Sequence, residues 1–76
     1  MDLQEAKQAR KALELAIAKA GGQRAFGELC GVKQQTVGDY LHKQGYLPYW
    51  HVEAVEEGTG VSRHDLRPDL SRVFQQ

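Results

Sequence analysis

Cysteine, proline and long apolar runs are all scarce in this sequence. The 76 residues include one cysteine, Cys30, so no disulfide can form within the chain, and the reducing cytoplasm is the expected compartment. The most apolar stretch, residues 12–20, is interrupted by Glu14 and Lys19. It is too short and too polar for a membrane span or for the core of a secretory signal. A membrane partner is therefore not expected.

Linkers, internal repeats and low-complexity segments are also missing. A chain of this length has room for one hydrophobic core, so residues 1–76 are predicted to form a single domain. So small a domain buries a modest share of its surface, and a second copy would add buried area. The sequence therefore favours a homodimer.

The chain has no net charge. Ten lysines and arginines balance ten aspartates and glutamates, whereas nucleic-acid-binding proteins usually carry a basic excess. The charges are unevenly distributed, because residues 46–58 contain Glu53, Glu56 and Glu57 but no lysine or arginine. The remaining segments are each slightly basic. A cationic face opposite an acidic one is compatible with this pattern.

Residue sets typical of catalysis or metal binding are absent from the pattern. No nucleophile is spaced with a base and an orienting group, and no phosphate loop or carboxylate pair is evident. His42, His51 and His64 fall on three predicted helices without the spacing of metal ligands. We therefore expect no enzymatic activity, no metal site and no cofactor. Cys30 is expected to pack in the interior.

Between its glycines and prolines the sequence has the periodicity of α-helices. Helices are predicted over four ranges: residues 3–20, 23–30, about 33–43 and 48–57. Pro48 would open the fourth of these helices and Gly58 would end it. Ser62 and Asp65 have the spacing of a capping box for a fifth, short helix that Pro68 would terminate. The predicted fold is all-α, with five short helices around one core and a tail that is compatible with extended structure.

Residues 23–43 carry the pattern on which the functional prediction rests. Two short helices are separated by a turn of about three residues, in which Gly31 would allow the positive φ needed to leave the first helix abruptly. Gly27 would let the two helices approach closely. Apolar residues would lock the angle between them: Phe26, Leu29, Cys30, Val32, Val37 and Tyr40. The pattern predicts a helix-turn-helix formed by the second and third helices, in which the third enters the DNA major groove.

Three segments, in this order, resemble a known family. They are Ala20-Gly21-Gly22-Gln23, Gly31-Val32-Lys33-Gln34 and Leu66-Arg67-Pro68-Asp69, and Leu47-Pro48 and Thr59-Gly60 also fit. Over roughly residues 12–70 the chain resembles Cro-type phage repressors and the related YdaS-like prophage antitoxins. The resemblance implies a lambda-repressor-like domain that represses transcription, binding a pseudo-palindromic operator in double-stranded DNA as a dimer. The antitoxin branch implies a protein partner, either a toxin or an anti-repressor.

Four positions depart from the family pattern. Gly27 stands where alanine is usual, Gly38 and Asp39 stand where serine and a basic residue are usual, and Tyr40 takes a place often held by tryptophan. Each helical glycine should cost about 1 kcal/mol relative to alanine. Asp39 either accepts a hydrogen bond from a cytosine amino group or only repels phosphate.

The resemblance assigns DNA contacts to the third helix and its surroundings. Base contacts are assigned to Gln34, Gln35 and Asp39, because glutamine can pair with adenine and a carboxylate can accept from cytosine. Contacts to the DNA backbone are assigned to Gln23, Arg24, Lys33, Thr36 and Lys43. The alternatives are that Gln34 only opens the helix and that the basic residues are solvated surface charges.

Two further groups have open alternatives. Tyr46, Tyr49 and Trp50 cluster before the fourth helix and are expected either in the core or at a dimer seam. Arg67 and Asp69 flank Pro68, where a salt bridge that holds the C-terminal turn is favoured over DNA contact. For the whole chain, the alternative to a DNA-binding regulator is an antitoxin or another protein-binding module that has the same fold but binds DNA weakly or not at all.

Overall fold

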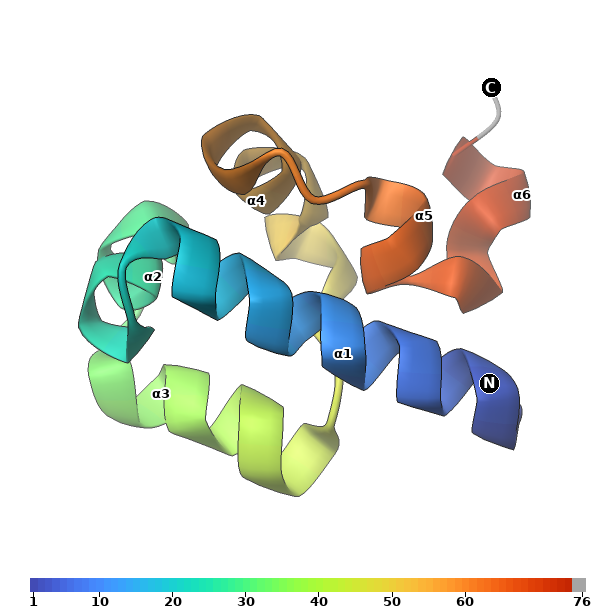
Figure 1. Cartoon of the computed structure of the whole chain (residues 1–76), viewed down its shortest axis with the longest axis horizontal. Helices are drawn as coiled ribbons and strands as arrows, with labels where there is room; N and C mark the ends of the chain where they lie inside the picture. Colours follow the sequence, from blue (N-terminus) through green and yellow to red (C-terminus); the bar gives the residue numbers. More distant parts are fainter. Residues whose placement is uncertain (75–76) are drawn as a thin grey trace.

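The computed structural model describes residues 1–74, and these form the predicted all-helical architecture. The first helix, α1 (Leu3–Ala20), is the longest and runs along one side of the molecule (Figure 1). Asp2 and Glu5 form a reciprocal capping box at its start, and Gly21 ends it in the left-handed conformation. Helix α1 therefore has defined ends at both termini and provides the surface on which the other helices pack.

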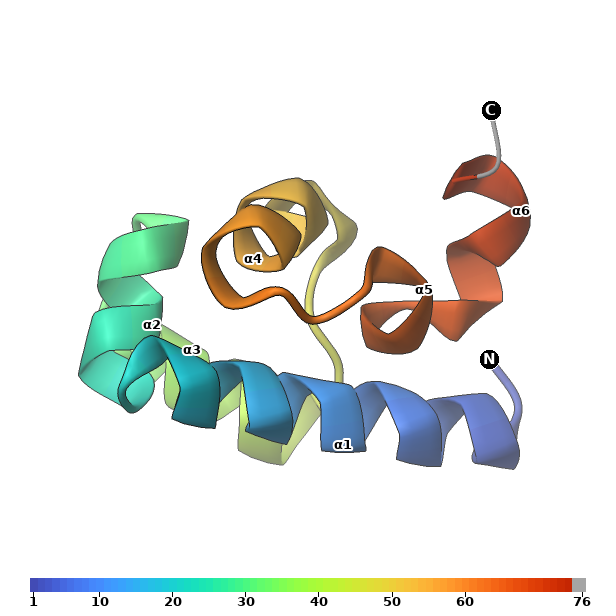
Figure 2. The same ribbon diagram turned by 45° about the horizontal axis from the view of Figure 1, so that its top comes forward.

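The core lies between α1 and the helices that cross it. Leu13 and Ala16 of α1 are fully buried against side chains of later elements: Phe26 of α2 (Gln23–Cys30), Val37 of α3 (Gln34–Asp39), Val55 of α4 (Val52–Thr59) and Leu66 of α5 (Arg63–Leu66). Helices α3 and α4 lie apart from each other in both views, and α2 contacts each of them (Figures 1 and 2). One core thus joins elements from α1 to α5 and leaves the outer face of α3 uncovered.

The third predicted helix changes its winding before it ends. It is α-helical over α3 and then continues as a π-helical turn, η1 (Tyr40–Gln44), which Gly45 closes by donating its N–H to Tyr40 O at 2.7 Å. The sequence predicted a regular α-helix to Lys43. A π-turn widens the helix by one residue and leaves backbone carbonyls to be satisfied by other partners.

The fourth predicted helix begins and ends later than its sequence pattern indicates. Pro48 precedes a 3₁₀ turn, η2 (Tyr49–His51), which leads into α4, and the left-handed residue that ends α4 is Gly60. The prediction that Gly58 ends this helix is wrong. A Cβ atom at Gly58 would lie 2.6 Å from Leu29 Cδ1, so the glycine instead makes room for α2 to pack against α4.

The aromatic residues near the start of α4 divide between two environments. Tyr46 is half-buried, but Tyr49 and Trp50 are 63% and 66% exposed, with their rings packed edge to face at 5.4 Å. Of the two alternatives for these side chains, a place in the core is therefore wrong, and a dimer seam stays a prediction. His51 takes the buried position in this turn instead.

The C-terminal residues that the structure describes are helical. Ser62 caps α5 by accepting a hydrogen bond from the His64 N–H, while the Asp65 carboxylate accepts one from Gln8 of α1 instead of completing a capping box. After α5 come the 3₁₀ turn η3 (Pro68–Leu70) and α6 (Ser71–Phe74), so residues 68–74 are helical where the sequence was also compatible with extended structure. None of the helices within residues 1–74 is long and apolar enough to cross a membrane.

Candidate nucleic-acid interface

The turn between α2 and α3 has the geometry that its glycines predict. Gly31 ends α2 with φ +75°, and the Val32 N–H donates to Gly27 O at 2.8 Å. A Cβ atom at Gly27 would lie 2.7 Å from Val32 O, which is closer than real contacts allow. The predicted close approach at Gly27 is therefore confirmed. It explains why glycine stands here in place of the alanine of the family pattern.

The apolar residues predicted to lock this turn lie on its inner side. Phe26 and Val37 are fully buried, and the other four are partly buried: Leu29, Cys30, Val32 and Tyr40. Burial raises the pKa of the Cys30 thiol to about 11, so this side chain is a protonated packing residue at neutral pH. The inner face of α3 is thus used for packing, and its outer face carries the polar side chains.

A shallow groove on this outer face gathers most of the predicted contact residues. Its lining comes from the start of α2, from α3 and from η1: Gln23, Gln34, Gln35, Gly38, Asp39, His42 and Lys43. All three residues assigned to base contact lie in it, together with two of those assigned to the DNA backbone. The groove offers side-chain amides, an imidazole, an ammonium and a carboxylate within one helix width, and so carries both hydrogen-bond donors and acceptors.

Gly38 lies in this groove next to Gln23. A Cβ atom at Gly38 would be 3.6 Å from Gln23 Oε1, an ordinary contact distance. Packing therefore does not require glycine at this position, in contrast to Gly27. Without a side chain at Gly38, the groove is open along the middle of α3.

Three predicted contact residues lie outside the groove lining. Arg24 is on the exposed side of α2, where its Nε is 3.7 Å from Glu28 Oε1 in a solvated ion pair. Lys33 is exposed at the residue before α3, and Thr36 is half-buried on the flank of that helix. These side chains border the turn but do not converge with the glutamines.

Asp39 and Lys43 are paired with each other. Lys43 Nζ lies 3.6 Å from Asp39 Oδ1, and the two side chains are 80% and 50% exposed. An ion pair this exposed is worth little, so either partner can exchange it for another contact at small cost. The pair lowers the repulsion that Asp39 alone would exert on a phosphate, and it keeps both charged groups at the groove.

The π-turn that positions Lys43 is held from two sides. Arg10 of α1 donates from Nη1 to Leu41 O at 3.0 Å, and the Tyr40 hydroxyl is 3.1 Å from His51 Nε2. Burial lowers the pKa of His51 and raises the pKa of Tyr40, so both groups are neutral at pH 7. Sequence patterns did not reveal these contacts, because each joins residues that lie far apart in the chain.

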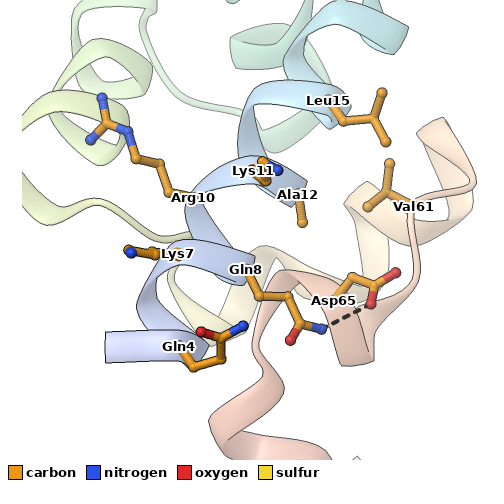
Figure 3. A pocket seen from close by; sticks show the side chains of 9 residues that line it. All are labelled: Gln4, Lys7, Gln8, Arg10, Lys11, Ala12, Leu15, Val61 and Asp65. Atoms are coloured by element: carbon orange, nitrogen blue, oxygen red, sulfur yellow. Dashed lines mark hydrogen bonds between the residues drawn. The ribbon is translucent and has the colours of Figure 1, made fainter. Parts of the chain in front are cut away.

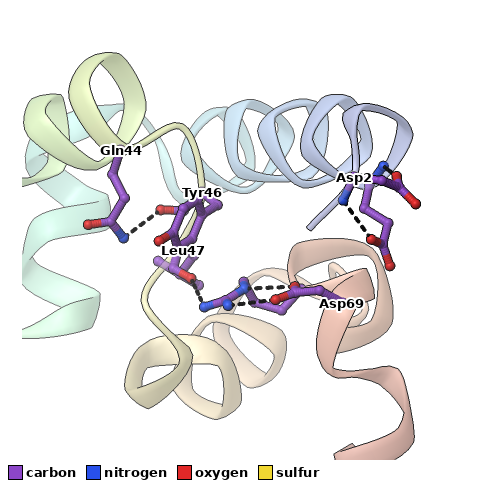
Figure 4. A network of polar contacts seen from close by, with 7 residues as sticks. Asp2, Gln44, Tyr46, Leu47 and Asp69 are labelled. Carbon is purple, nitrogen blue, oxygen red and sulfur yellow. Dashed lines mark hydrogen bonds and ion pairs between the residues drawn. The ribbon is translucent and has the colours of Figure 1, made fainter.

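Arg67 and Asp69 form a structural clamp on the C-terminal turn. Arg67 donates to Asp69 Oδ1 and Oδ2 at 3.1 and 2.9 Å and to Leu47 O at 3.2 Å, and its guanidinium lies 4.6 Å from the centre of the Tyr46 ring. The residues around this clamp are shown in Figure 4. The guanidinium holds the pKa of Asp69 below its ordinary value. The predicted salt bridge is therefore confirmed, and it ties the segment after η1 to the turn before η3.

The clamp and the segment formed by α2, the turn at Gly31 and α3 both fall within the region that matches a known family. The sequence model described as bacterial toxin YdaS matches residues 13–73. Searches of curated proteins and of solved structures found no match. The matched region begins inside α1 and extends into α6, so it includes the turn at Gly31, the outer face of α3 and the Arg67 clamp. The chain belongs to the bacterial toxin YdaS family.

Proposed function

We propose that this chain is a sequence-specific DNA-binding regulator of transcription that inserts α3 into the major groove. The observation that carries the proposal is the polar groove along α3, where Gln34 and Gln35 lie exposed beside Asp39. The major groove admits an α-helix, and paired hydrogen bonds from glutamine read adenine while a carboxylate accepts from the cytosine amino group. The buried inner face of α3 holds these side chains on a rigid element.

A dimer is the form in which such a regulator would bind a pseudo-palindromic operator. Two copies of α3 would then contact half-sites about 34 Å apart, one turn of DNA. Gln23, Arg24, Lys33, Thr36 and Lys43 border the helix and would contact phosphates. Three of these residues, Arg24, Lys33 and Lys43, are cationic, so binding by a dimer should weaken steeply as the salt concentration rises.

The test is selection of bound sequences from random duplex DNA, at two salt concentrations. The wild-type protein should enrich a two-fold symmetric consensus, and Gln35→Ala should relax one position in each half-site. Gln44→Ala is the matched control, because Gln44 is exposed in η1 but lies outside the groove lining. The proposal is wrong if folded protein enriches nothing at low salt.

A second candidate function is suggested by the family description, which names a toxin. In this function the chain would arrest bacterial growth when it is expressed without a neutralising partner. Induced expression of the wild type and of Gln35→Ala in bacterial cells separates the two candidates. Growth arrest by both proteins would favour toxicity through protein contacts, whereas arrest by the wild type alone would place toxicity on the DNA-reading face.

A further inference from the structure

A second groove, of about 630 Å³, follows α1 on the side of α5. Its apolar floor is formed by Ala12, Leu15 and Val61, and Leu15 is 51% exposed. Its charged residues are three cations of α1 and one carboxylate of α5: Lys7, Arg10, Lys11 and Asp65. Figure 3 shows Lys7 and Arg10 on one side of α1, and Gln8 and Leu15 on the side of Asp65 and Val61. The groove is therefore apolar at its base and basic along its rim.

The basic rim is only partly neutralised by the rest of the chain. Arg10 is engaged with Leu41 O, and Asp65 is engaged with Gln8. Lys7 and Lys11 are exposed, and neither takes part in an ion pair among residues 1–74. Lys11, four residues before the exposed Leu15 on α1, and Lys7 at the rim are thus available to a partner that carries carboxylates and apolar side chains.

A surface with this complementary chemistry lies on the same chain, at η2 and α4. It consists of four exposed residues: Tyr49, Trp50, Glu53 and Glu57. The last three are spaced by three and four residues, which keeps them on one face of the helix. We call these four residues the aromatic–acidic patch. Its two carboxylates have no ion-pair partner among residues 1–74, although they interact through charge with Arg63. Arg63 is itself held by Glu56 at 2.7 Å, so the patch stays acidic.

We propose that the chain forms a homodimer in which the α1 groove of each copy receives the aromatic–acidic patch of the other. Charge selects this pairing, because patch against patch would bring Glu53 and Glu57 together, and groove against groove would bring Lys7 and Lys11 together. Two reciprocal contacts related by a two-fold axis close the assembly at a dimer. The contact would bury three large side chains that are exposed in the single chain: Leu15, Tyr49 and Trp50.

The test measures self-association without DNA, so that its outcome is independent of the proposed function. Sedimentation of the wild type should show a monomer–dimer equilibrium that weakens between about 50 mM and about 500 mM salt, as charge screening requires. Trp50 is the only tryptophan, so its fluorescence should shift to the blue as the dimer forms. A wild type that stays monomeric at all concentrations would overturn the proposal, as would species that grow beyond dimers.

Two charge-reversed variants identify the surfaces. Lys7→Glu/Lys11→Glu makes the groove acidic and Glu53→Lys/Glu57→Lys makes the patch basic, so each variant alone should dimerise at least about tenfold more weakly. An equal mixture of the two variants should recover the dimer, because both reciprocal contacts are then between opposite charges. Lys19→Glu/Arg72→Glu lies outside both surfaces and makes the same change in net charge as the groove variant, so it should dimerise like the wild type. Circular dichroism verifies that every variant is folded.

The mixture gives the decisive result. Recovery of a heterodimer shows that these two surfaces form the contact. A single chain carrying all four reversals then identifies the reciprocal pairing, because it should dimerise with itself, whereas groove against groove and patch against patch would both bring like charges together. A mixture that stays monomeric, or variants that dimerise as the wild type does, would overturn the proposal.

Discussion

The outer face of α3 and the Arg67 clamp belong to the same family-matched region, yet they differ in burial and in the number of polar contacts that their charged side chains make. The clamp pair, Arg67 and Asp69, is 12% and 19% exposed and makes several polar contacts. The pair on α3, Lys43 and Asp39, is 80% and 50% exposed and is joined by one contact at 3.6 Å. The comparison separates residues that hold the fold from residues that are free to meet a partner.

The difference lies in how firmly the rest of the chain holds each segment. The Leu66-to-Asp69 segment lies in the family-matched region, and its Arg67 side chain is engaged with Leu47 and Tyr46 within the chain. Gly38 and Asp39 depart from the family pattern, and they lie where a Cβ atom at Gly38 would meet only Gln23 and where Asp39 is held by one exposed ion pair. Substitutions on the outer face of α3 should therefore leave the fold intact.

The largest expected effect comes from opening the clamp. Arg67→Ala leaves Asp69 with its negative charge in a largely buried site and removes the contact with Leu47, so the free energy of unfolding should fall by about 3 kcal/mol. Chemical denaturation measures this change. Arg24→Ala, which removes an exposed ion pair, is the matched control and should cost less than about 1 kcal/mol. Equal effects of the two substitutions would contradict the distinction between the clamp and the surface.

Gly27 and Gly38 are the two glycines that depart from the family pattern, and replacing each by alanine should change the free energy of unfolding in opposite directions. Gly27→Ala places a methyl group against a backbone carbonyl, so it should destabilise the fold by about 1–3 kcal/mol despite the better helix propensity of alanine. Gly38→Ala meets only Gln23 at an ordinary distance and should stabilise the fold by about 0.5–1 kcal/mol. Thermal unfolding of both variants checks the signs, and a stable Gly27→Ala would show that the turn is less tightly packed than described.

Acidification should affect His51 before it affects the clamp. Burial holds the pKa of His51 below its ordinary 6.5, so the unfolded chain binds this proton more tightly, and stability is lost as the pH falls below about 6.5. The pKa values of Glu56 and Asp69 are lowered from 4.5 and 3.8 by Arg63 and Arg67, so their contributions are lost only below those values. Denaturation between pH 7 and pH 5 should therefore show a decline that His51→Gln reduces. An unchanged slope in that variant would exclude His51 as its source.

The smallest effect on stability and the clearest effect on recognition are expected at Asp39. Asp39→Asn breaks an exposed pair and should change the free energy of unfolding by less than about 1 kcal/mol. Asparagine pairs with adenine whereas a carboxylate accepts from cytosine, so the preferred base at one position should change, with about 1–3 kcal/mol of discrimination. Repeating the sequence selection with this variant measures the change. An identical consensus would remove Asp39 from the base-reading residues.

Sequence patterns predicted the parts of the fold that depend on neighbouring residues. The abrupt turn between α2 and α3 followed from the glycines at 27 and 31 and from the apolar spacing around them, and the Arg67–Asp69 pair followed from its closeness in the chain. The π-turn η1 did not follow, because it is supported by Arg10 and His51 from distant segments. The end of α4 was also missed. Gly58 and Gly60 both offer a helix stop, and the choice between them depends on the contact of Gly58 with Leu29.

The candidate site was predictable in composition but not in arrangement. Helical spacing placed Gln34, Gln35 and Asp39 on one face, and the structure brings them into one groove. The same spacing could not show that Arg24 and Asp39 are each paired with a neighbour, since ion pairing depends on the side-chain conformation. Exposure of Tyr49 and Trp50 was likewise hidden, because aromatic residues in a small domain are usually counted toward the core.

The most direct test of whether α3 is the element that reads DNA is a nuclear magnetic resonance titration of the protein with a duplex enriched in the sequence selection. If α3 enters the major groove, the amide signals of residues 34–43 shift on binding, while those of residues 46–48 and 66–69, around the clamp, keep their positions. Shifts confined to the clamp or to α4, with α3 unaffected, would contradict the assignment of α3 as the DNA-reading element.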